Sequence, residues 1–163
     1  MNYEEAVAYI EETPKFTTKN KLEHTKECLR RLGNPQKQFR VVHVAGTNGK
    51  GSVCEYISNA VKADNKSVGK FTSPYIDCIE ERIQVNDKYI SRPAFALLCE
   101  QVKNAVEQTG FSGFSQFEIL CAIALLYFYK EQVSVAVIET GIGGLLDCTN
   151  IVNPVVSVIT TVD

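Results

Sequence analysis

Three continuous runs of β-branched and other apolar residues limit what this chain can fold into. They cover residues 40–45 (RVVHVA), 133–139 (VSVAVIE) and 155–161 (VVSVITT). Strands that are apolar at nearly every position are typical of parallel sheets with both faces covered. Helical patterns fill much of the chain between these runs. The sequence therefore predicts an α/β fold, a mainly parallel sheet with right-handed crossovers.

The remaining segments give a consistent order of elements. Periodicity and capping signals predict helices over 2–12, 20–34 (stopped by Gly33), 50–62, 93–108 and 116–130. Four side chains of the 50–62 helix are expected to face inward: Val53, Tyr56, Ile57 and Ala60. A further strand is expected over 67–71, and alternating residues around Asn86-Asp87 predict a small inserted β-hairpin.

Composition argues against several classes of protein. The 163 residues include 17 Lys and Arg and 19 Asp and Glu, with no basic block, so charge gives no case for a nucleic-acid or membrane partner. The longest apolar stretch, 117–129, contains Glu118 and is too short to cross a bilayer, which favours a buried helix.

Cysteine and histidine usage argues against a structural zinc site. Six cysteines contain no CxxC pair, and the two histidines are far apart. No secretion signal opens the chain, so we expect reduced, mostly buried thiols in a cytoplasmic protein. His43 lies within a strand and is expected to be a hydrogen-bonded core residue, whereas His24 is expected on the surface.

The segment GTNGKGS, residues 46–52, follows a buried strand and opens a helix. Gly46, Gly49 and Gly51 permit positive φ and close backbone approach, so successive N–H groups can turn toward an anion. The helix N-terminus adds further N–H groups, Lys50 adds a positive charge, and Ser52 adds a hydroxyl. We interpret the segment as a phosphate-binding loop. Its spacing departs from GxxxxGK[ST], and a glycine-rich turn without a ligand is the alternative.

Other strand ends are expected at the same edge, because ligands of parallel sheets bind beyond the carboxyl ends of the strands. Glu139 closes the 133–139 run as the acidic residue of a Walker B strand does, and would hold Mg²⁺ against nucleotide oxygens. A solvent-facing acid is the alternative. The TSP segment at 72–74 follows another strand, and Thr161 to Asp163 follow the last one. Asp147 could cap a turn or touch substrate.

Together these segments resemble the N-terminal part of a folylpolyglutamate synthase, often bifunctional with dihydrofolate synthase, in the Mur ligase superfamily. The matching segments are LGNPQ (32–36), HVAGTNGKGSV (43–53), TSPY (72–75), EERIQVN (80–86), FEIL (117–120), VAVIETGIGGLLDCTNIV (135–152) and PVVSVIT (154–160). Mur ligases in general share only GTNGK, so the surrounding segments point to the folate branch.

The resemblance implies ATP-dependent ligation of L-glutamate to a folate or to dihydropteroate through an acyl phosphate. The ATP phosphates would be held by Gly46, Thr47, Asn48, Gly49, Lys50, Gly51 and Ser52. Lys50 and Glu139 would be catalytic, and Mg²⁺ would be bound by Ser52, Ser73 and Glu139. The residues expected near the substrate are Thr72, Ser73, Pro74, Tyr75, Arg82 and Asp147.

The resemblance also implies that residues 1–163 are the N-terminal portion of an ATP-binding central domain whose glutamate-ligase C-terminal domain is absent. The chain alone is then expected to be inactive. Glu80, Tyr75 and Leu145 stand where the family often has Asn, His and Arg, and these departures are expected to bear on the pterin side. Only small-molecule partners and a monomer are expected. The alternatives are a nucleotide-binding P-loop module without ligase activity and a scaffold domain.

Overall fold

A computed structural model describes residues 1–17 and 22–162. Its helices are α1 (Tyr3–Glu12), α2 (Leu22–Arg31), α3 (Lys50–Ala63), α4 (Arg92–Thr109) and α5 (Gln116–Lys130). Its strands are β1 (Arg40–Ala45), β2 (Val68–Phe71), β3 (Ile83–Val85), β4 (Lys88–Tyr89), β5 (Val135–Glu139) and β6 (Val156–Ile159), and its short 3-10 turns are η1 (Pro35–Lys37), η2 (Ile79–Arg82) and η3 (Cys148–Ile151). This order confirms the predicted α/β class. The first two residues of the predicted 20–34 helix lie outside the described residues.

Within the described residues, the strands form one six-stranded sheet in the order β4-β3-β2-β5-β1-β6. β2, β5, β1 and β6 run parallel, and the β3–β4 hairpin adds to the edge of β2 in antiparallel pairing. The predicted turn is confirmed, since Asn86 and Asp87 have φ of 49° and 64°, as a tight hairpin turn requires. The parallel strands end together at one edge, referred to below as the carboxyl edge.

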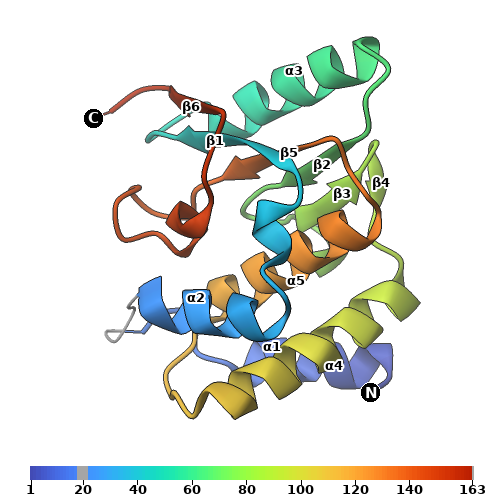
Figure 1. Cartoon of the computed structure of the whole chain (residues 1–163), viewed down its shortest axis with the longest axis vertical. Coiled ribbons are helices and arrows are strands. Elements are labelled where there is room, and N and C mark those ends of the chain that lie inside the picture. Colours follow the sequence, from blue (N-terminus) through green and yellow to red (C-terminus); the bar gives the residue numbers. More distant parts are fainter. Residues whose placement is uncertain (18–21, 163) are drawn as a thin grey trace.

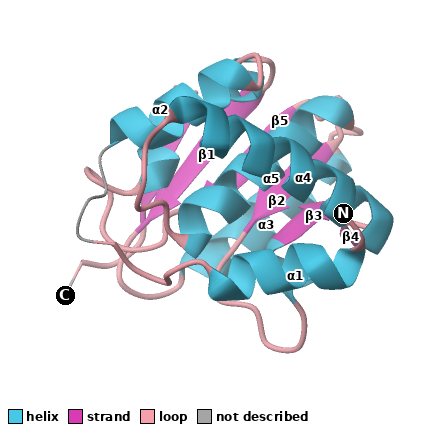
Figure 2. Ribbon diagram, turned by 90° about the horizontal axis from the view of Figure 1, so that it is seen from below, coloured by secondary structure: helices cyan, strands magenta, loops and turns pink. Residues whose placement is uncertain are grey.

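Helices cover the two faces of the sheet unequally (Figures 1 and 2). On one face, α3 packs Cys54 against Val42, Val44 and Val137. On the other face, α5 lies against the sheet, and α1, α2 and α4 pack around α5. The larger hydrophobic core forms between the sheet and these helices. The resulting layers leave the loops at the carboxyl edge open.

α5 is central because it is apolar on nearly every side, as expected for a helix packed between two layers. Ser115 and Glu118 form a capping box at its N-terminus. Gly69 in β2 lets this helix approach, because a Cβ there would lie 2.5 Å from Cδ1 of Phe128. Among the described residues, no helix has the length and apolarity needed to cross a membrane.

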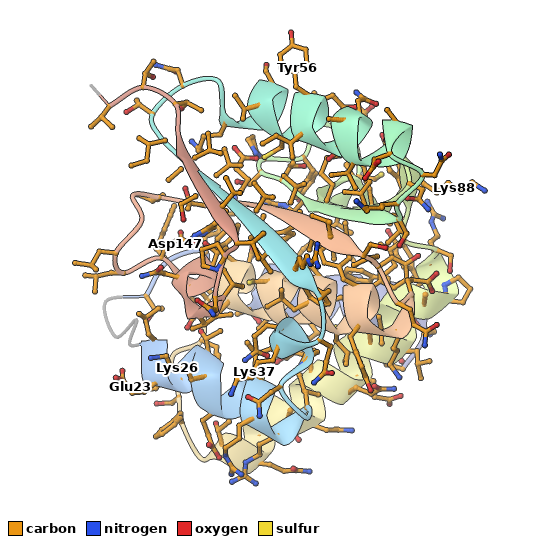
Figure 3. All side chains as sticks on the ribbon, turned by 45° about the horizontal axis from the view of Figure 1, so that its top comes forward. Glu23, Lys26, Lys37, Tyr56, Lys88 and Asp147 are labelled. Atoms are coloured by element: carbon orange, nitrogen blue, oxygen red, sulfur yellow. The ribbon has the colours of Figure 1, made fainter. Side chains whose placement is uncertain are left out.

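The predicted inward face of α3 is partly wrong. Tyr56 is 75% exposed, and Figure 3 shows its side chain projecting from α3 away from the sheet. Ala60 is exposed as well, whereas Cys54 and Ser58 are buried. The helix therefore packs through a face displaced toward Cys54, where smaller side chains permit close contact with the sheet.

The prediction of a doubly covered last strand is also wrong for the described structure. β6 is shorter than the predicted 155–161 run, and Val156 and Ile159 remain 51% and 69% exposed. The reason is that no described helix packs extensively over β6, which pairs with β1 on one side and is the edge strand of the described sheet on the other. The apolar pattern of residues 155–161 shows that the strand is suited to burial on both faces, but it does not identify the elements that would cover those faces.

Candidate functional site

The loop between β1 and α3 has the backbone geometry of an anion-binding turn. Gly46 and Gly49 have φ of 137° and 80°, a region that favours glycine. Gly49 is the N-cap of α3 and brings no side chain to cap the helix, so the N–H groups of the first turn remain directed at the carboxyl edge. These donors and the positive end of the helix dipole can receive a phosphate.

Lys50 places its ammonium over this loop. Its Nζ donates to the carbonyl oxygens of Gly46 at 2.9 Å and Thr47 at 3.4 Å. Phosphate oxygens are stronger acceptors than neutral carbonyls, so the ammonium is positioned to exchange these contacts for an anion. Ser52 is exposed in the first turn of α3, and Gly51 leaves open space, because a Cβ there would meet nothing within 4 Å.

The segment after β6 braces the loop, a role that sequence reasoning missed. The carbonyl of Thr161 accepts from the N–H of Thr47 at 2.6 Å, and its hydroxyl accepts from the N–H of Asn48 at 3.3 Å. Thr160 donates its hydroxyl to the Asn48 carbonyl at 2.6 Å. Thr161 is expected at this edge from the end of its strand, but the sequence predicts no contact between Thr161 and the loop. Asp163 lies outside the described residues.

Glu139 ends β5 beside the loop and is 3% exposed. Its Oε2 accepts from the backbone N–H of Ser73 at 2.9 Å. Burial raises the pKa of Glu139, although the Ser73 N–H and the charges of Lys50 and Arg82 favour the ionised form. The structure thus brings together Glu139, Ser73 and Lys50 from three different loops or strand ends.

The donor groups at this edge fit a hard cation better than zinc. Within residues 1–17 and 22–162, no three His, Cys, Asp or Glu side chains cluster in a way that could hold a metal ion. A cation beside Glu139 would therefore depend on this carboxylate together with hydroxyl, phosphate and water oxygens. Mg²⁺ accepts such ligands, and a buried carboxylate that is costly to ionise gains from a nearby cation.

A cavity of about 740 Å³ opens at the same edge. Its walls come from residues 15–16, 73–75, 82, 115–118, 120, 141–142 and 146–148, which belong mainly to loops and to the start of α5. The predicted substrate residues that line it are Ser73, Pro74, Tyr75, Arg82 and Asp147. Thr72 does not line it, and instead donates its N–H to the carbonyl of Arg82 at 3.1 Å.

Asp147, labelled in Figure 3, lies in the loop that follows β5, and its carboxylate binds backbone N–H groups of that loop. Its Oδ2 accepts from the N–H groups of Gly141 and Ile142 at 2.9 and 3.0 Å, and its Oδ1 accepts from the N–H of Thr149 at 3.0 Å. The Thr149 hydroxyl contacts Nε2 of His43 at 2.7 Å. Of the two roles left open for Asp147, these bonds demonstrate the capping one.

The histidines differ from each other in environment. His43 is buried and hydrogen-bonded, as predicted, and burial lowers its pKa. His24 was expected on the surface, but it is half-buried and its ring stacks on Phe111 at 4.5 Å. Neither histidine lines the cavity.

Two successive carboxylates fix the loop that leads to Arg82. Glu81 accepts from the N–H groups of Ile76, Asp77 and Cys78 at 2.8, 2.9 and 3.1 Å, and these bonds lower its pKa. Glu80 points away from the cavity and accepts from Nε of Arg92 at 3.2 Å. The Glu80 and Leu145 positions, expected to bear on the pterin, do not line the cavity, whereas Tyr75 does.

Arg82 turns from the end of η2 into the cavity wall. Its guanidinium carbon lies 5.1 Å from the centre of the Tyr75 ring. Its Nε is inaccessible to solvent and has no hydrogen-bond partner among the described residues. Burial lowers the pKa of Arg82, since the charged form loses hydration there.

Comparisons with known proteins match this chain to part of the folylpolyglutamate and dihydrofolate synthases. No protein-family model matches the chain. It is 42% identical over 164 residues to the dihydrofolate synthase/folylpolyglutamate synthase of Bacillus subtilis, and 42% identical over 166 residues to the folylpolyglutamate synthase of Lacticaseibacillus casei. These alignments cover 98% and 99% of this chain but 38% and 39% of the relatives. The chain thus spans about two fifths of their length.

A solved complex of a folylpolyglutamate synthase with AMPPCP and folate has the same arrangement of elements. Its TM-score is 0.91 at 42% sequence identity, over 98% of this chain and 40% of that chain. The predicted mainly parallel sheet flanked by helices agrees with this match.

Proposed function

This chain is homologous to part of the folylpolyglutamate and dihydrofolate synthases. From this premise we propose that the chain carries the ATP-phosphate site of a ligase that joins L-glutamate to a folate or to dihydropteroate. Residues 1–163 would be the N-terminal portion of its ATP-binding domain. The observation that carries this proposal is the meeting of a phosphate-type loop, a buried strand-end carboxylate and a 740 Å³ cavity at one edge of the sheet.

In this proposal the loop 46–52 holds the phosphates of ATP. Its backbone N–H groups and the N-terminus of α3 bind phosphate oxygens, and Lys50 moves from the loop carbonyls to the outer phosphate. The main catalytic task of Lys50 is to stabilise charge on the phosphoryl group during transfer.

The proposed reaction has two steps, phosphoryl transfer and amide formation. A carboxylate oxygen of the acceptor attacks the γ-phosphorus, and ADP leaves with the electron pair of the broken P–O bond. The amine of L-glutamate then attacks the acyl carbon, phosphate leaves with the C–O electron pair, and the nitrogen loses a proton. ATP is required because a carboxylate cannot expel oxide when an amine attacks, whereas phosphate is a workable leaving group.

Glu139, Ser73 and Ser52 are the residues proposed to hold Mg²⁺. When bound, this ion would neutralise charge on the phosphate oxygens. Glu139 supports the assignment because its carboxylate is buried and lies close to the loop. The expectation of a monomeric, cytoplasmic enzyme with only small-molecule partners is part of the same proposal.

The test uses a protein extended to the length of the relatives, assayed for ADP formation. We expect ADP release to require both L-glutamate and an acceptor acid, either tetrahydrofolate or dihydropteroate, and residues 1–163 alone to show no turnover. Glutamate-independent ATP turnover, or nucleotide binding without turnover in the extended protein, would instead support the alternative of a nucleotide-binding P-loop module.

A further inference from the structure

The cavity at the carboxyl edge is lined by side chains of both charges, but its carboxylates already have partners. Glu118 accepts from the N–H and hydroxyl of Ser115 and from the hydroxyl of Thr25. Asp147 accepts from three backbone N–H groups. The oxygens of both carboxylates therefore already accept hydrogen bonds from the protein, which leaves them less able to bind a ligand.

The two cations of the cavity wall are in the opposite situation. Lys15 and Arg82 form no hydrogen bond or ion pair through their side chains with any residue that the structure describes. Among the charged side chains that line the cavity, the two without a hydrogen-bond or ion-pair partner in the described structure are both positive, which favours an anionic ligand. Of the two, Arg82 is the more buried, so it gains more from an anion.

The geometry of Arg82 suits a carboxylate. A guanidinium presents a planar set of N–H donors that matches the two oxygens of a carboxylate, and it stays charged when buried. The Tyr75 ring lies against it at 5.1 Å and restricts its orientation. Its Nε is shielded from water without a partner, an arrangement that costs free energy until an acceptor arrives.

The residues before Arg82 hold it in place. Glu81 binds three successive backbone N–H groups of its own loop, and Glu80 is bound by Arg92 from α4. Arg92 in turn lies 4.8 Å over the ring of Tyr3 in α1. The loop is thus fastened both to itself and to the outer helices, so the guanidinium is positioned before any ligand binds.

Arg82 also lies near the phosphate loop. Ser73 lines the cavity together with Arg82 and donates its backbone N–H to Glu139 at 2.9 Å, and Glu139 lies in register with Val44 at the end of β1, the strand that leads into the loop. An acid bound at Arg82 would therefore lie at the same edge of the sheet as a phosphate held by the loop, and an attack on phosphorus requires the two groups to be near each other.

We propose that Arg82 binds the carboxylate of the acceptor acid that becomes phosphorylated, and that this contact selects an acid over its neutral amide. The inference rests on the proposed function, which supplies the acceptor. To the proposed function it adds that the cavity recognises the carboxylate of the substrate and that Arg82 is the residue that binds this group.

The test compares pteroate with pteroamide, which share one ring system and differ only in the carboxyl group. Binding of each is measured by titration calorimetry to the protein extended to the length of the relatives. The variants are Arg82→Gln, Arg82→Lys and, as a matched control, Arg40→Gln at the opposite end of β1. Circular dichroism checks that each variant folds, and Mg-ATP affinity is measured alongside.

We expect Arg82→Gln to weaken pteroate binding by roughly 10- to 100-fold, the usual range for losing a charged hydrogen bond. Pteroamide and ATP affinity should change little, Arg82→Lys should retain part of the pteroate affinity, and Arg40→Gln should resemble the parent.

Equal weakening of pteroate and pteroamide would overturn the inference and indicate a packing role for Arg82. Weakened ATP binding with unchanged pteroate binding would overturn it in favour of a phosphate contact. If the parent protein binds neither pteroate nor pteroamide, the proposed substrate class fails, and the inference fails with it.

Discussion

Glu139, which is proposed to hold Mg²⁺, lowers the stability of the ligand-free fold at neutral pH. Its carboxylate is buried at the end of β5, and burial raises its pKa. The folded protein therefore binds the proton of Glu139 more tightly than the unfolded chain does. The stability from this group is full below the ordinary carboxyl pKa and is lost as pH rises through the raised value.

Replacing Glu139 with Gln should stabilise the ligand-free fold at pH 7.5, by about 0.5–2 kcal/mol, while abolishing ligation. The amide keeps an acceptor for the Ser73 N–H but carries no charge to desolvate. Thermal unfolding of the parent and of Glu139→Gln at pH 7.5 and pH 5 measures the stability difference between them. This difference should be smaller at pH 5, where Glu139 of the parent is more protonated. A variant less stable than the parent at pH 7.5 would contradict this account of Glu139.

Gly46 is required by close contact as well as by its backbone conformation. A Cβ at Gly46 would lie 2.0 Å from Oγ1 of Thr160, and φ is 137°. Gly46→Ala should cost roughly 1–3 kcal/mol in the free energy of unfolding and weaken ATP binding, because the loop must shift away from its brace. Gly144→Ala is the control, since a Cβ there meets nothing within 4 Å. Urea unfolding should show a change close to zero for Gly144→Ala, and equal effects of the two substitutions would refute the argument.

The conformation of the loop 46–52 could be predicted from sequence because it is local. Glycines, a lysine and a helix start within seven residues indicate a tight strand-to-helix turn without reference to the rest of the fold. The bracing by Thr160 and Thr161 could not be found this way, because it depends on β6 lying next to β1. The orientation of Glu80 away from the cavity was equally hidden, since its partner Arg92 belongs to another element.

At the scale of elements, the loop after β5 depends on a single carboxylate. Asp147 accepts three backbone N–H groups, so Asp147→Ala would leave these donors without their partner. We expect a loss of about 1–3 kcal/mol in the free energy of unfolding and faster proteolysis within 141–147. Asp77→Ala is the control, because Asp77 is exposed and contributes only its backbone N–H to Glu81. Unchanged proteolysis in Asp147→Ala would show that the loop is held by other contacts.

The positions of the elements were largely predictable, because each begins or ends with a strong local signal. Ser115 and Glu118 mark the start of α5, and Asn86-Asp87 marks the hairpin turn. Burial was predicted less well. The face of α3 and the exposure of β6 depend on which neighbour each element meets, and a single sequence pattern does not specify the neighbour.

At the scale of the whole molecule, the burial of the six cysteines shows how tightly the core is packed. All are free thiols, and every one except the half-buried Cys78 is buried. Burial raises the pKa of Cys28, Cys54 and Cys99 to about 12, which suppresses the reactive thiolate.

Titration with Ellman's reagent should therefore label Cys78 first in the folded protein, and all six thiols only after unfolding. Cys78→Ser should remove the early phase. An early phase that persists in Cys78→Ser would show that the buried core opens far more readily than the packing implies.

The layers of the molecule leave the loops at the carboxyl edge uncovered, and the proposed function requires the loop 46–52 at that edge to hold a triphosphate. The most direct measurement is the affinity for Mg-ATP of the parent protein, extended to the length of the relatives, against Lys50→Met and Lys62→Met. Both lysines belong to α3, but Lys62 lies at the far end and pairs with Asp87. We predict a loss of at least ~10-fold for Lys50→Met, as expected for a charged hydrogen bond, and little change for Lys62→Met. Equal affinities for the parent and Lys50→Met would contradict the central claim.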